Sequence, residues 1–110
     1  IGIHGDGGQT RDFIHVTDIV GALAYAGASK DMAGTYNVGY GQSQSILALA
    51  QEIIRLTGSK SAIEHLPPRA GDVRHSLAST ERLLAAGWKA QSSVSAGLAE
   101  TVAYFRQLRA

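Results

Sequence analysis

The chain has 110 residues, which is enough for one domain with a modest hydrophobic core. Its formal net charge is only +1 and both signs are interspersed, which argues against a nucleic-acid or anionic-membrane partner. The absence of cysteine excludes disulfides, thiolate metal sites and cysteine nucleophiles, and it is typical of a cytoplasmic protein. No apolar run reaches the length that crosses a membrane, so we expect no membrane partner.

The N-terminal part is predicted to hold two strands, a glycine-rich turn and a helix. Ile1–His4 and Arg11–Val16 contain β-branched and aromatic strand formers, and the Asp-Gly-Gly sequence between them favours a tight reversal. A helix is expected over Asp18–Ser29, because its apolar residues fall on one stripe. Either Thr17 or the aspartate after it is the expected N-cap of this helix.

The middle of the chain is predicted to hold a buried strand and a well-defined helix. Thr35–Val38 has the mixed apolar character of a short strand buried on both faces, as in a parallel sheet. The following Gly39-Tyr40-Gly41 suits a loop in which the backbone comes close to a ligand. Ser45 is expected to cap a helix that runs to about Thr57 and ends at Gly58.

The last part is predicted to add one strand and two helices. Ile63–Leu66 reads as a strand closed by two prolines, and Arg69–Ser76 reads as a loop. A short helix is expected over Thr80–Ala86, and a final helix with one apolar stripe is capped by Ser93 or Ser95. The chain contains no internal repeat or linker, so we expect one domain of the α/β class with mixed α+β character.

Two arginines stand where their guanidinium groups can leave the surface. Arg11 opens a strand after the glycine-rich turn, and Arg69 lies on a loop constrained by Pro67-Pro68 and Gly71. Two guanidinium groups that converge on one diphosphate would give affinity and register through bidentate, charge-assisted hydrogen bonds. The structural alternatives are ion pairs: Asp6 or Asp12 for Arg11, and Asp72 for Arg69.

Several other polar residues are interpreted as structural. A lone histidine in a strand, such as His4, is often hydrogen-bonded locally, and we interpret His15, His75 and Arg74 as structural. The four histidines match no ligand spacing and no carboxylate cluster accompanies them, so no metal site is expected. A dinucleotide site needs a glycine-rich turn between a strand and a helix, whereas GDGG precedes a strand. We therefore expect this chain to bind no cofactor by itself.

The stretch GDGGQTRDFIHVTDIV resembles the signature that follows the catalytic half of the NAD-dependent sugar-nucleotide epimerase/dehydratase family, the extended short-chain dehydrogenases. Further pieces occur in that family's order, so the resemblance covers essentially the whole chain. The final pieces GDVRHSLA and VSAGLAET are most similar to the UDP-N-acetylglucosamine 4-epimerase branch. The other matching pieces are TYNVGYG (Thr35–Gly41), SILALAQEI (Ser45–Ile53), RAGDVRHSLA (Arg69–Ala78) and GW (Gly87-Trp88).

The resemblance implies that residues 1–110 form the C-terminal, substrate-binding domain of a longer NAD-dependent UDP-sugar 4-epimerase, without the Rossmann half. The start at Ile1, without methionine, agrees with a cut through a longer protein. In such enzymes a tyrosinate removes the proton of the sugar 4-hydroxyl as hydride passes to NAD, and hydride returns to the other face. The alternatives are a nucleotide-sugar 4,6-dehydratase or decarboxylase, taking a dTDP-sugar for example, a stand-alone non-catalytic module, or a chain that binds nothing.

Residue by residue, the resemblance implies that Arg11 and Arg69 hold the diphosphate. It implies that Asp72 holds the ribose or its own loop, and that His4 contacts the base or the sugar. The family's catalytic tyrosine is followed four residues later by lysine, and no tyrosine here has lysine at that spacing, so no catalytic residue is expected. Ser79 replaces the family's usual aspartate, which puts in doubt the anchoring of the helix behind it.

The resemblance also predicts association. In the family, Thr35–Val38 and the helix Asp18–Ser29 lie against the cofactor-binding half. Without that half their apolar faces would be exposed, and exposed apolar patches tend to find a partner. We therefore predict that the chain forms a homo-oligomer or exchanges elements between copies.

Overall fold

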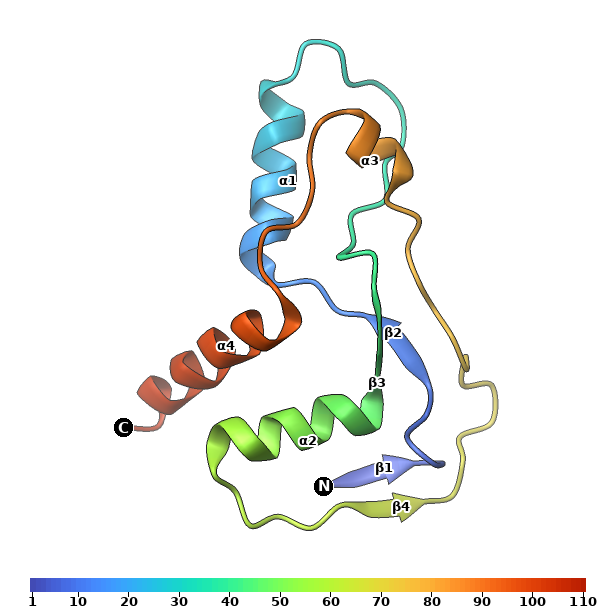
Figure 1. Ribbon diagram of the computed structural model, residues 1–110, viewed down its shortest axis with the longest axis vertical. Helices are drawn as coiled ribbons and strands as arrows, with labels where there is room; N and C mark the ends of the chain where they lie inside the picture. The colour runs from blue at the N-terminus through green and yellow to red at the C-terminus, as the bar shows by residue number, and fades with distance from the viewer.

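Eight short elements follow one another along the chain, and long irregular segments connect several of them (Figure 1). The computed structural model describes all residues from 1 to 110. The α/β class expected from the sequence is confirmed, with four helices and four three-residue strands. In chain order the elements are β1 (Gly2–His4), β2 (Thr10–Asp12), α1 (Val16–Ala28), β3 (Ser43–Ser45), α2 (Ile46–Thr57), β4 (Glu64–Leu66), α3 (Glu81–Ala85) and α4 (Val94–Leu108).

The strands form two separate pairs rather than one sheet. β1 pairs in parallel with β4, and β2 pairs in antiparallel register with β3. The expected reversal between β1 and β2 is present, but the two strands do not pair with each other. The backbone of the turn is instead held by distant elements, because Gly5 N–H donates to the carbonyl of Leu66 and Leu47 N–H donates to that of Gly7, each at 2.9 Å.

Two strand predictions are wrong, one in extent and one in existence, and one strand was missed. β2 ends at Asp12 rather than at Val16, and α1 begins at Val16, two residues earlier than expected. Thr35–Val38 is irregular, because no strand lies beside it and the Thr35 carbonyl accepts from the Arg82 side chain at 2.6 Å. The sequence did not predict β3, a Ser-Gln-Ser segment whose ladder partner is β2.

The prediction of α2 from its capping residues is confirmed at both ends. The Ser45 hydroxyl accepts a hydrogen bond from Ala48 N–H at 3.1 Å, and Gly58 ends α2 with a φ of 65°. Ser93 caps α4 in the same way. The cap of α1 differs from the prediction, since His15 occupies that position without a side-chain hydrogen bond.

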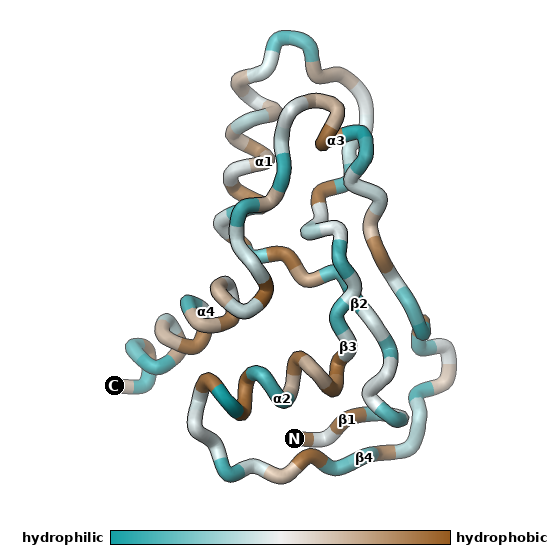
Figure 2. The backbone as a smooth tube through the Cα atoms, in the orientation of Figure 1, coloured by the Kyte–Doolittle hydropathy of each residue, from teal (hydrophilic) through white to brown (hydrophobic).

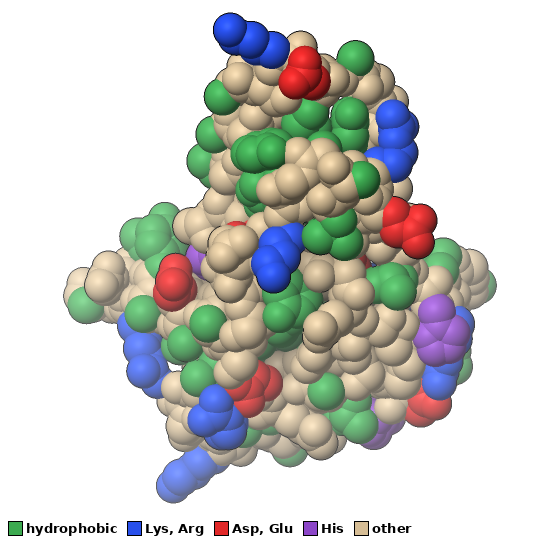
Figure 3. Space-filling view, turned by 45° about the horizontal axis from the view of Figure 1, so that its top comes forward, with side chains coloured by type: hydrophobic (Ala, Val, Ile, Leu, Met, Phe, Trp, Pro, Cys, Tyr) green, Lys and Arg blue, Asp and Glu red, His purple; other side chains and the backbone are tan.

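Few side chains are fully enclosed. The molecule measures 50 × 38 × 17 Å, and its apolar residues, brown in Figure 2, are spread over α1, α2, α4 and the connecting segments. In the space-filling view apolar side chains reach the surface in patches, with charged groups scattered between them (Figure 3). None of the helices combines the length and apolar character needed to span a bilayer. The buried apolar residues are Ile3, Ala22, Ala50 and Leu83.

Candidate functional site

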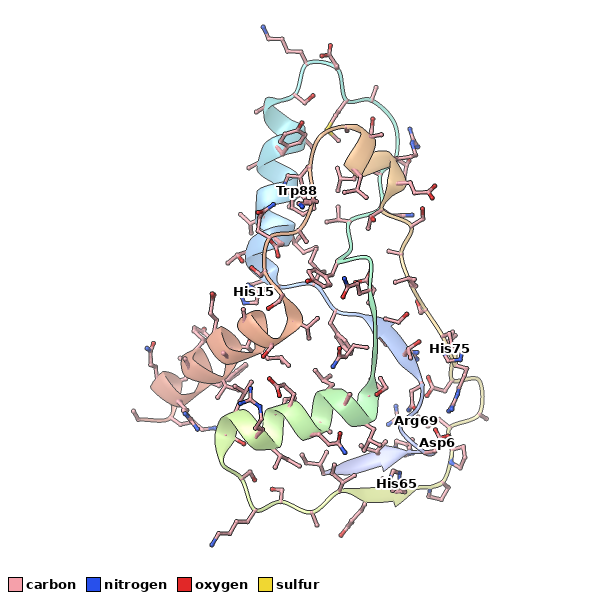
Figure 4. All side chains as sticks on the ribbon, in the orientation of Figure 1. Asp6, His15, His65, Arg69, His75 and Trp88 are labelled. Carbon is pink, nitrogen blue, oxygen red and sulfur yellow. The ribbon has the colours of Figure 1, made fainter.

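A polar hollow of about 380 Å³ lies between the turn after β1 and the loop after β4. Two segments more than fifty residues apart in the chain form it, and Figure 4 shows Asp6 and Arg69 at this corner of the molecule. Three of the four predicted site residues, His4, Arg69 and Asp72, line the hollow. The remaining lining residues are Gly5, Asp6, Gln9, Pro68 and Arg74.

Arg69 is the free cation of this hollow. Its side chain makes no hydrogen bond or ion pair with the rest of the chain, and the residue is exposed. The loop that carries it is nevertheless defined, because Gly71 has a φ of 80° and Asp72 N–H donates to the Arg69 carbonyl at 3.3 Å. A guanidinium in this setting can offer a planar pair of donors to an anion.

Arg11 and Asp72 form an ion pair. The Nη2 of Arg11 donates to Oδ1 of Asp72 at 2.8 Å, and its Nη1 donates to the Thr10 carbonyl at 2.8 Å. Neither structural alternative weighed from the sequence occurs, since Arg11 pairs with Asp72 rather than with Asp6 or Asp12, and Asp72 does not pair with Arg69. Arg11 itself lines a neighbouring hollow, so Asp72 is its link to the site.

His4 is tied to the same loop. Its Nδ1 donates to the Pro67 carbonyl at 2.9 Å, which fixes the imidazole at the edge of the hollow. The side-chain amide of Gln9, a residue that is 8% exposed, donates to the His4 carbonyl at 3.0 Å and so holds the end of β1 in place. A contact of His4 with a base or sugar stays a prediction.

Asp6 and Arg74 form a second ion pair at the hollow. Nη1 and Nη2 of Arg74 donate to the two carboxylate oxygens of Asp6 at 2.6 and 3.0 Å, and Gly8 N–H donates to Oδ1 at 2.8 Å. The Arg74 guanidinium, with help from the Gly8 amide, holds the pKa of Asp6 well below its usual range. The sequence did not single out Asp6 as a site residue, and its only signal was an aspartate opening a glycine turn.

Asp12 holds the glycine loop that the sequence placed near a ligand. Its carboxylate accepts from Tyr40 N–H at 2.9 Å and from Gly41 N–H at 3.0 Å. This loop lines a separate hollow of about 310 Å³ next to Trp88, away from Arg69. Sequence reasoning missed Asp12, whose partners lie 28 and 29 residues further along the chain.

The glycine-rich turn lacks the strand-to-helix setting in which backbone amides cradle a dinucleotide pyrophosphate. It leads into β2, not into a helix. One first-turn amide of α2, that of Ala48, donates to the Ser45 hydroxyl, and one of α4, that of Ala96, donates to the Ser93 hydroxyl. No three histidine, aspartate or glutamate side chains lie close enough together to hold a metal ion.

Known proteins are similar to this chain in sequence and in fold. A family model described as the NAD dependent epimerase/dehydratase family matches residues 1–39. UDP-glucose 4-epimerase of Mycolicibacterium smegmatis is 38% identical over 105 residues, covering 94% of this chain and 34% of that protein. dTDP-D-glucose 4,6-dehydratase of Bos taurus is 32% identical over 113 residues, covering 96% of this chain and 32% of that protein.

Among solved structures, UDP-glucose 4-epimerase of Thermotoga maritima with UDP-glucose superposes with a TM-score of 0.92 at 32% identity. The match covers 100% of this chain and 36% of that protein. The chain therefore spans about a third of the length of the relatives that it matches.

Proposed function

Because the chain belongs to the NAD-dependent epimerase/dehydratase family, we propose that it is the part of a UDP-sugar 4-epimerase that binds the nucleotide diphosphate. We propose further that residues 1–110 act as one C-terminal substrate-binding domain. The relatives that match are about three times as long, which leaves room for a separate cofactor-binding part.

The observation that carries this proposal is the unpaired guanidinium of Arg69 in a polar hollow. A nucleoside diphosphate presents oxygens that a planar guanidinium binds bidentately. Arg11 lines the neighbouring hollow and keeps N–H groups free after its bonds to Asp72 and the Thr10 carbonyl. It would supply the second contact to a diphosphate that extends from one hollow to the other. Asp72 would then hold either the ribose or Arg11, and His4 would contact the base or sugar.

In this proposal the chain contributes grip and orientation rather than bond-making groups. Fixing a substrate by its diphosphate places the distant sugar and lowers the entropic cost of reaction. The family model is described as NAD dependent, and the glycine-rich turn of this chain leads into β2 rather than into a helix. We therefore assign NAD, and the tyrosine and lysine of the family, to the part of the enzyme outside these residues.

A second candidate function is the same grip in a dTDP-sugar 4,6-dehydratase. The 32% identity to the bovine dehydratase favours keeping it, and a decarboxylase would share the same diphosphate contacts. The two relatives are named for substrates with different bases, uracil in UDP and thymine in dTDP. A clear preference of this chain for UDP over dTDP would therefore favour the epimerase over the dehydratase. A third candidate is a stand-alone module that associates with its own copies. The exposed apolar residues of α1 favour this candidate.

The decisive experiment is an NMR titration of the labelled chain with UDP-N-acetylglucosamine, with UDP and dTDP as comparisons. We expect localised shifts at Arg11 and Arg69, with a dissociation constant of about a millimolar for half a site. Arg69→Gln should weaken binding by about tenfold or more, the value of one charge-assisted contact. Arg109→Gln, which removes another unpaired arginine at the far end of the chain, is the matched control. Equal binding by both variants would contradict the proposal.

A further inference from the structure

Two ion pairs join the turn after β1 to the loop after β4 in a reciprocal way. The segment from the turn after β1 through β2 contributes a carboxylate, that of Asp6, and a guanidinium, that of Arg11. The loop contributes a carboxylate, that of Asp72, and a guanidinium, that of Arg74. Each carboxylate pairs with the guanidinium of the other segment, so the two segments are linked at two points about the hollow.

The two pairs differ in what they leave free. Arg74 donates from both Nη atoms to both oxygens of Asp6, so its fork is already occupied. Arg69 has no partner at all, and Arg11 uses one Nη on a carboxylate. Arg74 is therefore poorly placed to bind an anion itself, although it lines the hollow that contains Arg69.

The segment between these anchors is pinned at both ends. At its start, the Pro67 carbonyl accepts from His4. At its end, Thr10 N–H donates to the Arg74 carbonyl at 2.8 Å and Ser76 N–H donates to the Thr10 carbonyl at 3.1 Å. Arg69 and Asp72 lie between the two anchors, on a stretch whose own residues are exposed.

We propose that the Asp6–Arg74 ion pair is a positioning clamp that holds the loop of Arg69 and Asp72 in the shape that receives the diphosphate. The inference rests on the proposed function of this hollow. Holding the loop before the ligand arrives removes part of the ordering cost of binding. Asp6 and Arg74 are therefore positioning residues that act through Arg69 and Asp72.

Gly8 provides a way to open the clamp without removing a charge. A Cβ built on Gly8 would lie 2.6 Å from Nη2 of Arg74 and 3.2 Å from Oδ1 of Asp6. The φ of Gly8 is not in the left-handed region, so alanine is compatible with the backbone. Gly8→Ala should push the guanidinium aside and leave the rest of the turn in place.

The test compares the binding of UDP to the wild-type chain, Arg74→Gln and Gly8→Ala. We expect both variants to raise the dissociation constant about five- to tenfold, and to raise the backbone mobility of residues 69–73 in ligand-free ¹⁵N relaxation. Arg55→Gln is the matched control, because Arg55 forms an equally bidentate surface pair with Glu52 on α2. The control should stay within about twofold of wild type. Thermal melts verify that each variant is folded.

The outcomes separate the clamp from the site. Wild-type binding that both variants preserve would overturn the clamp and leave the proposed function standing. Tighter binding by Gly8→Ala would show Arg74 to be a direct ligand once freed, which also overturns the clamp. Absence of UDP binding by the wild-type chain would overturn the proposed function and the clamp with it. Loss of fold in Arg74→Gln would leave Gly8→Ala to decide.

Discussion

Asp18 joins the start of α1 to the segment that precedes α4. Its carboxylate, in a residue that is 5% exposed, accepts hydrogen bonds from the backbone N–H groups of Gln91 and Ser92, both at 2.9 Å. Burial raises the pKa of Asp18, but the two backbone hydrogen bonds outweigh it and hold the pKa below its ordinary value. One side chain thus stabilises a contact between parts of the chain more than seventy residues apart.

Replacing Asp18 by alanine should lower the free energy of unfolding by about 2 kcal/mol, because two backbone donors lose a charged acceptor. Urea denaturation followed by circular dichroism measures the change. Asp31→Ala, which removes an exposed aspartate whose side chain has no partner, is the control and should stay within about 0.5 kcal/mol of wild type. An equal effect of the two substitutions would contradict the role given to Asp18.

The contrast between Arg69 and Asp18 marks how far single residues could be predicted. The sequence shows that Arg69 stands on a constrained loop, and the structure places it in a hollow with His4 and Asp72. The sequence also suggested Asp18 as a helix cap, whereas its carboxylate accepts hydrogen bonds from Gln91 and Ser92, which lie 73 and 74 positions further along the chain. The Asp6–Arg74 pair, separated by 68 residues, was likewise invisible, because one sequence contains no information on which distant charges meet.

At the scale of elements, local chemistry explains why helices were easier to predict than strands. A serine cap and a stop glycine fix both ends of α2 within one continuous segment. A strand needs a partner from elsewhere, so the polar β3 exists because β2 lies beside it, and the apolar Thr35–Val38 has no such partner. Which segments form strands therefore depends on the topology of the whole chain, and a local sequence pattern does not reveal that topology.

The attachment of α4 to α2 should weaken in acid. The hydrogen bond from Arg55, together with one from the Ser95 hydroxyl at 2.7 Å, lowers the pKa of Glu52 from 4.5 to about 2. A carboxyl with a lowered folded pKa stabilises the fold above its unfolded pKa and loses that contribution as pH falls through the folded pKa. The contribution of Glu52 is therefore full above about pH 4.5 and is lost toward pH 2.

Glu52→Gln should remove this part of the pH dependence. The glutamine amide keeps an acceptor for Ser95 but does not titrate, so the melting temperature should fall less between pH 4.5 and pH 2 than in the wild type. Thermal melts across this range measure the difference. Glu81→Gln on α3, an exposed carboxyl without an ion-pair partner, should follow the wild-type curve. A parallel fall in all three proteins would contradict the assignment.

The whole molecule exposes more surface than its mass requires. Its accessible surface is 7449 Å², whereas a compact monomer of this mass exposes about 5,800 Å². Its radius of gyration is 16.5 Å, against about 13 Å for a compact domain of this length. The excess of roughly 1,600 Å² is as large as a whole protein–protein interface of standard size. Part of it lies on α1, where Val16, Val20 and Leu23 share one face and are each more than half exposed.

The chain spans only a third of the length of its relatives, and nothing within it covers the apolar stripe of α1. We therefore predict that the 110-residue chain associates with its own copies through this stripe. Light scattering at increasing concentration should show a mass above that of the monomer. The double substitution Val20→Ser and Leu23→Ser should return the mass to about 11.5 kDa, because serine removes the apolar area that another copy would cover. Leu77→Ser, which removes an exposed leucine far from α1 in sequence, should leave association unchanged. A monomeric mass for the wild-type chain at high concentration would mean that the stripe stays solvated, and the predicted association would then be wrong.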